Sequence, residues 1–248
     1  MNTKSEAEQT GILVLGRAAA MLAEAVTPLL IVRLLGKADV GALAGLMLIY
    51  HTLTVVLTAG FPPAVLYFLA DRTANTRRWI IGRMAIVLVG LGALSSLLLI
   101  AIGTWGDAAL SAFGSWLVRG EADSTPSTVD LSYLVYFALF PIFDIPARIL
   151  SNLFIGEGRP RSAAGYGVSQ SLGMSIGIGL PAALGHGLKG IIFGLTCFGL
   201  LQALGMFCTI RVIYRGTSPT PDHDLTVGRL FRFVLPLGMT DIVNTLNA

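Results

Sequence analysis

Long stretches without a charged residue constrain this chain more than any other feature. Residues 40–70 and 84–103 contain no Lys, Arg, Asp or Glu, and neither do residues 162–188 and 190–210. A helix that crosses the hydrocarbon core of a bilayer needs about 20 mostly apolar residues. Charged residues make up only 12% of the chain, whereas a soluble domain carries roughly 25%. The sequence therefore predicts an integral membrane protein.

Two further stretches are long enough to cross a bilayer although they contain charged residues. Residues 11–35 carry three charged side chains and residues 131–155 carry two, all at isolated positions. With these two crossings, the sequence predicts an all-α membrane protein in which six transmembrane helices form a bundle.

The predicted crossings divide the chain into parts. Residues 1–216 are interpreted as an N-terminal lobe of six helices, and residues 217–228 as a cytoplasmic linker that contains Pro and Asp. Residues 229–248 are predicted to begin a seventh helix, which is still apolar at Ala248. The linker therefore looks like a boundary between two units, of which this chain holds the first and the beginning of the second.

The distribution of Lys and Arg predicts the orientation. One side of the bundle receives the N-terminus and every second loop, and its basic residues outnumber those of the other side. The first side holds Lys4, Arg72, Arg77, Arg78, Arg83, Arg159, Arg161, Arg211, Arg215, Arg229 and Arg232, and the second holds Arg33, Lys37, Arg119 and Lys189. The positive-inside rule then places the N-terminus in the cytoplasm and the protein in the cell (inner) membrane.

Two arginines within predicted crossings are candidates for substrate binding. Arg17 and Arg148 both lie about two turns from the cytoplasmic end of their helices. At one depth they would line a basic cavity, which suits a phosphate or an acidic sugar because guanidinium binds such groups in bidentate fashion. Alternatively, each side chain extends to the membrane surface, or Arg148 pairs with Asp144, four residues earlier on the same helix face.

Two acidic residues at membrane depth are candidates for a coupling proton or cation. Glu24 lies near the middle of the first crossing, and Asp144 lies within the fourth. A carboxyl group in the membrane is costly and is therefore expected to be protonated or partnered. The alternative is that each is a hydrogen-bonding group between helices.

Proline, glycine and tryptophan predict local irregularities. Gly60-Phe61-Pro62-Pro63 predicts a break in the second crossing, and Pro141 and Pro146 predict bends in the fourth. Residues 108–117, in the connection at 104–130, are amphipathic; Trp105 precedes them and Trp116 lies near their end. We interpret them as a short helix at the external interface.

Other chemistry has little support in the sequence. Two cysteines and three histidines are scattered without the spacing of metal ligands. There is also no phosphate-binding glycine loop after a strand and no nucleophile motif. We expect no cofactor, no metal site, no nucleic-acid partner and no enzymatic activity.

Four motifs resemble the polysaccharide flippases of the multidrug/oligosaccharidyl-lipid/polysaccharide (MATE-like) exporter superfamily. Residues 31–41 (IVRLLGKADVG) are similar to the end of their first helix, and residues 57–70 to their second. Residues 152–160 (NLFIGEGRP) are similar to the turn after their fourth helix, and residues 231–237 (FRFVLPL) to the entry of their seventh. Members of this family have two lobes of six helices.

The resemblance implies a function for the intact protein. It would flip an oligosaccharide linked to polyprenyl diphosphate across the cytoplasmic membrane, by rocking of two lobes around a cavity in which Arg17 binds the substrate. Its partners would be this lipid-linked oligosaccharide, membrane lipids and the missing second lobe. Two alternatives remain: a cation-coupled multidrug antiporter of the same superfamily, which Glu24 favours, and a non-transporting membrane scaffold subunit.

Overall fold

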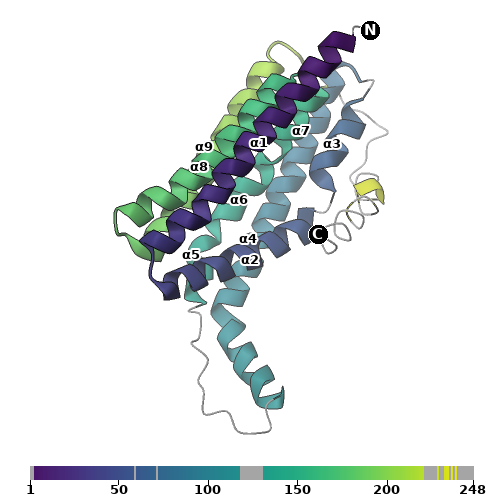
Figure 1. The fold of residues 1–248 in the computed structure, drawn as a ribbon. Helices are drawn as coiled ribbons and strands as arrows, with labels where there is room; N and C mark the ends of the chain where they lie inside the picture. The colour runs from purple at the N-terminus through teal and green to yellow at the C-terminus, as the bar shows by residue number, and fades with distance from the viewer. Residues whose placement is uncertain are drawn as a thin grey trace.

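The described part of the chain is almost entirely helical and contains no strand (Figure 1). The computed structural model describes residues 3–58, 60–70, 72–117 and 131–220, and also Gly228, Arg232–Val234, Pro236 and Gly238. Its helices are α1 (Thr3–Leu34), α2 (Lys37–Thr58), α3 (Phe61–Leu69), α4 (Ala74–Leu117), α5 (Ser132–Phe137), α6 (Leu139–Ala147), α7 (Ile149–Gly156), α8 (Pro160–Ala183) and α9 (Gly187–Ile213).

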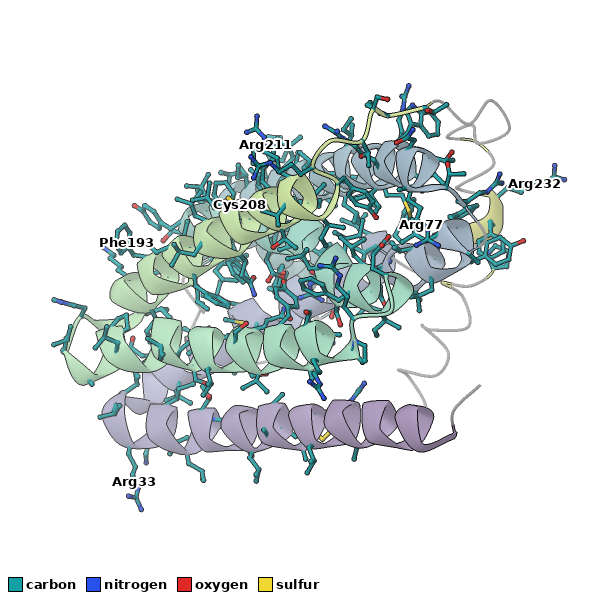
Figure 2. All side chains as sticks on the ribbon, turned by 90° about the horizontal axis from the view of Figure 1, so that it is seen from above. Arg33, Arg77, Phe193, Cys208, Arg211 and Arg232 are labelled. Carbon is teal, nitrogen blue, oxygen red and sulfur yellow. The ribbon has the colours of Figure 1, made fainter. Side chains whose placement is uncertain are left out.

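The helices run up and down the bundle in chain order. α1 leads away from the end that carries the N-terminus, α2 and α3 return, α4 leads away, α5 to α7 return, and α8 and α9 form the last pair (Figure 1). α6 packs against both α4 and α9, whereas α8 packs between α1 and α9. Figure 2 shows α1 as a rod alongside α8, at the edge of the bundle.

Five stretches of the described helices are long and apolar enough to cross a membrane. They are Val14–Leu34, Lys37–Leu69, Ala74–Gly106, Leu139–Gly156 and Gly187–Ile213. The protein is therefore an all-helical membrane protein, but the predicted count of six is not confirmed. The remaining candidate, α8, has 24 residues and a length of about 36 Å, yet its many glycines and serines make it less apolar.

The predicted seventh helix lies mostly outside the described residues, as do residues 221–227 of the predicted linker. Its described part, Arg232–Val234, is helical and packs on α3. Phe233 stacks on Tyr67, with ring centroids 4.2 Å apart, and meets Phe68 edge to face. This contact ties the start of the predicted seventh helix to the described bundle.

The break between α2 and α3 falls at Gly60, as predicted. Gly60 has a φ of 75°, a left-handed conformation that glycine adopts without steric cost. A Cβ atom at this position would also lie 2.7 Å from the backbone nitrogen of Gly238. Pro62 and Pro63 then occupy the first turn of α3, where their missing N–H groups have no helical partner to lose.

The fourth predicted crossing consists of three short helices, α5, α6 and α7, with turns at Ala138 and Arg148. Pro146 lies inside α6, where it cannot donate the backbone hydrogen bond to residue 142 and its ring crowds that carbonyl. The crossing is therefore interrupted near both prolines, and one interruption lies at Arg148; the predicted bends stay a prediction.

The predicted interfacial helix at 108–117 is wrong as a separate element. Residues 108–117 are the last part of α4, a helix of 44 residues that extends beyond the rest of the bundle (Figure 1). The reason is that residues 104–107 contain no proline, so the helix continues past the apolar run. Trp105 is exposed on this helix.

Buried apolar side chains form two clusters along the bundle. One joins α3, α7, the first half of α4 and the end of α9. The other joins α2, α5, the middle of α4, the end of α8 and the start of α9. α6 contributes Ile145 to the first cluster and Phe140 to the second, so the residues between them lie where the two clusters meet.

α8 and α9 approach each other most closely at a pair of glycines. A Cβ atom on Gly194 would overlap the carbonyl oxygen of Gly177, and one on Gly177 would lie 3.2 Å from the carbonyl oxygen of Gly194. Glycine in membrane helices permits this close backbone approach, which increases van der Waals contact.

We predict that Gly194→Ala destabilises the bundle, because the added methyl group meets backbone atoms that cannot rotate away. The expected cost is about 1–3 kcal/mol, measured as a lower Tm of the detergent-solubilised protein. Gly205→Ala is the matched control, because a Cβ at Gly205 in the same helix meets nothing within 4 Å. An equal Tm for both variants would contradict the close contact.

Candidate functional site

A buried polar cluster joins α2 to α6 and α7 inside the bundle. The Tyr50 hydroxyl donates a short hydrogen bond to Oδ2 of Asp144. Arg148 donates from Nε to the same Oδ2, over 2.9 Å, and from Nη2 to the Tyr50 hydroxyl, over 3.2 Å. The three side chains therefore form a closed triangle of hydrogen bonds.

The fold positions each of the three side chains. Asp144 and Arg148 lie one helical turn apart across the junction of α6 and α7, so both side chains point to the same side. The ring of Tyr50 is held edge-on by Phe137 and Phe140, with centroids 5.5 and 5.1 Å away. These aromatic contacts leave the hydroxyl directed at the carboxylate.

Burial differs between the two charged groups, and this difference defines what the site can do. The Asp144 side chain is 5% exposed, whereas that of Arg148 is 31% exposed. A guanidinium has five N–H donors, and the contacts to Asp144 and Tyr50 use two of them. Asp144 thus anchors Arg148 from the buried side, while other N–H groups of the arginine are able to bind an anion.

The structure confirms the contact between Asp144 and Arg148 that their spacing predicts. It does not bring Arg17 into this cluster: Arg17 is exposed on α1, next to Gly16, which packs against Ala164 of α8. The side chain of Glu24 lies outside the described residues. The predicted roles of all four residues in substrate or ion binding stay predictions.

Tyr50 is the member of the cluster that the sequence did not single out. It lies in an uncharged run beside His51, which is exposed. Thr54 follows Tyr50 by one helical turn and is buried beside its hydroxyl. The only sequence signal is this spacing of four between two hydroxyl-bearing residues, which places both on one helix face.

A second polar cluster lies at the end of the bundle that carries the N-terminus. Glu157, at the end of α7, accepts a hydrogen bond of 2.6 Å from Tyr214 and pairs with Arg77 over 3.3 Å. Burial raises the pKa of Tyr214, and the hydrogen bond to Glu157 raises it further. The phenol therefore remains a donor, and the cluster ties α4, α7 and the end of α9 together.

Comparison with known proteins identifies a family. A family model described as "Polysaccharide biosynthesis protein" matches residues 7–248. No curated protein and no solved structure matches the chain significantly. The match covers the described helices almost completely, including all members of both polar clusters.

We predict that Tyr50→Phe lowers the stability of the bundle by about 1–2 kcal/mol, because Asp144 loses a hydrogen bond while remaining buried. The measurement is Tm in detergent. Tyr136→Phe is the control, since Tyr136 is 60% exposed and its Tm should not change. If both variants melt like the parent protein, the hydroxyl does not support Asp144.

Proposed function

The chain belongs to the polysaccharide biosynthesis protein family, and from this premise we propose that the protein flips a polyprenyl-diphosphate-linked oligosaccharide across the cytoplasmic membrane. The family match over residues 7–248 is the observation that carries the proposal. Five helices able to cross a membrane agree with transport. The proposed mechanism is alternating access, in which this bundle rocks against a second lobe.

Arg148 is the residue that we assign to the diphosphate. Its guanidinium is part of a polar cluster at membrane depth, and residues of this kind in membrane helices commonly mark substrate pathways. Asp144 and Tyr50 hold the side chain on its buried side, so an anion would approach its exposed edge. Guanidinium binds phosphate oxygens in pairs, which gives orientation as well as attraction.

Arg17 and the two acids complete the proposal. Arg17 is exposed on α1 and is proposed as a second contact to the diphosphate or to acidic sugars. Glu24 or Asp144 is proposed to carry the coupling proton or cation. The N-terminus is proposed to lie in the cytoplasm. Among the described residues, ten Lys and Arg belong to the side that carries the N-terminus and three to the other side, and the positive-inside rule places the richer side in the cytoplasm.

We expect Arg148→Lys to reduce transport about tenfold or more while the protein still folds. A lysine keeps the charge but cannot reach Asp144 and Tyr50 and also present a planar pair of donors to phosphate. The measurement is complementation of a flippase-deficient strain by the variant expressed together with the second lobe on which the mechanism depends, with the amount of membrane-inserted protein as a check. Arg211→Lys is the control, because Arg211 is exposed on α9.

Arg17→Ala and Glu24→Gln separate the flippase from the antiporter. A flippase should lose complementation with Arg17→Ala, since a basic contact to the substrate is removed. An antiporter should instead give drug efflux that fails with Glu24→Gln, because the amide cannot exchange a proton. Full complementation by Arg17→Ala would remove Arg17 from the site, and drug efflux without complementation would overturn the flippase proposal.

A further inference from the structure

A cavity of about 320 Å³ lies between α1, α2 and α8, away from both polar clusters. Its walls include Ile31 of α1, Ala44 and Met47 of α2, and Met174 of α8. All three helices carry these residues in the half of the bundle opposite the N-terminus (Figure 1). The cavity therefore belongs to one leaflet of the bilayer.

The lining of the cavity selects an apolar occupant. Its hydroxyl groups come from Thr27, Ser171 and Ser175. The Thr27 and Ser175 hydroxyls bond to each other over 2.5 Å, and Ser175 also donates to the backbone carbonyl of Ser171 over 2.8 Å. These polar groups are engaged within the protein, so the cavity offers mainly hydrocarbon and flexible methionine side chains, which adapt to irregular apolar shapes.

The shape of the cavity favours a chain over a helix. α1 and α2 meet at their connecting turn and then diverge, because α1 leans on α8 (Figure 1). The cavity lies between these two helices and α8. An α-helix with its side chains is about 10 Å wide. A single hydrocarbon chain is much narrower.

Lys37 supplies a positive charge near the end of the cavity that is closest to the membrane surface. Lys37, Val40, Ala44 and Met47 follow one another at intervals of three or four residues, so they share one face of α2. Lys37 to Met47 spans about 15 Å along the helix, which is half of a hydrocarbon core of about 30 Å. This distance is that of a lipid tail that reaches from the surface toward the midplane.

The charged residues nearest to Lys37 in the sequence, Arg33 and Asp39, are directed elsewhere. The Asp39 carboxylate lies close to Gly187, the first residue of α9. Figure 2 shows Arg33 on the far side of α1, pointing away from α8. Lys37 is thus the charged side chain on the cavity face of α2, and it suits an anionic headgroup.

We propose that this cavity holds the first units of the polyprenyl chain of the transported lipid, with the phosphate of that lipid at Lys37. The identity of the lipid rests on the proposed function, whereas the position of the chain rests on the cavity itself. Under the proposed orientation, the site lies in the outer leaflet and receives the lipid after it has been flipped.

The test uses the purified protein in nanodiscs and a polyprenyl phosphate with a photoreactive group in its first isoprene units. We expect labelling of peptides from α1, α2 and α8, and about a tenfold decrease in Ala44→Trp, whose side chain fills the cavity. Leu48→Trp is the control, because Leu48 is 68% exposed and does not line the cavity. A Tm measurement establishes that each variant is folded.

Lys37→Gln tests the headgroup separately. It should weaken labelling by the polyprenyl phosphate about fivefold, the factor that corresponds to ~1 kcal/mol per lysine near a charged lipid, and leave labelling by an uncharged polyprenol unchanged. Equal labelling in Ala44→Trp and Leu48→Trp, or equally strong labelling by a photoreactive phosphatidylglycerol, would overturn the proposal. Specific labelling, together with failure of this bundle and its second lobe to complement the flippase-deficient strain, would reject the proposed function and leave the cavity assignment standing.

Discussion

A carboxylate buried among membrane helices needs hydrogen-bond donors and an opposite charge beside it. The residues that supply them to Asp144 determine how the centre of this bundle is built. Its oxygen accepts from Arg148 and Tyr50, which links α2 to the junction of α6 and α7. Removing one partner from such a group leaves an unpaired charge, which is more costly than the net gain of the intact pair. The cluster therefore fixes the register of α2 against α6, and the Phe137 and Phe140 rings pack around a hydroxyl that is already positioned.

The small residues of α8 explain both its packing and its low apolarity. On one side α8 receives Gly16 of α1 against Ala164, and on the other it meets Gly194 of α9 through Gly177. Two helices that pack so closely on α8 require small residues, such as glycine, alanine and serine, along α8. The same residues reduce the apolar character on which the recognition of a membrane span depends. α8, the fifth predicted crossing in chain order, is consequently long enough to span a membrane but is not identified by its apolarity.

The sequence predicted those features that depend on local chemistry. Uncharged runs identified most of the helices, Gly60 and two prolines marked the break before α3, and the spacing of Asp144 and Arg148 predicted their contact. It did not identify Tyr50, because a tyrosine in an apolar run carries no charge and its partner lies 94 positions away in the chain. Long-range partners of neutral polar groups become visible only in three dimensions.

Polar side-chain contacts link the helices in one half of the bundle, whereas the other half contains the apolar cavity. Glu157 holds α4, α7 and the end of α9 together near the N-terminus, whereas α1 and α2 diverge at the opposite end around an apolar space. α2 connects the two halves, because Met47 lines the cavity and Tyr50, three residues later on the same side of the helix, contacts Arg148. A chain that entered the cavity and displaced α2 would therefore act on the hydrogen bond that orients Arg148. One face of α2 thereby joins the cavity that we assign to the lipid chain after flipping to Arg148, which we assign to the diphosphate during transport.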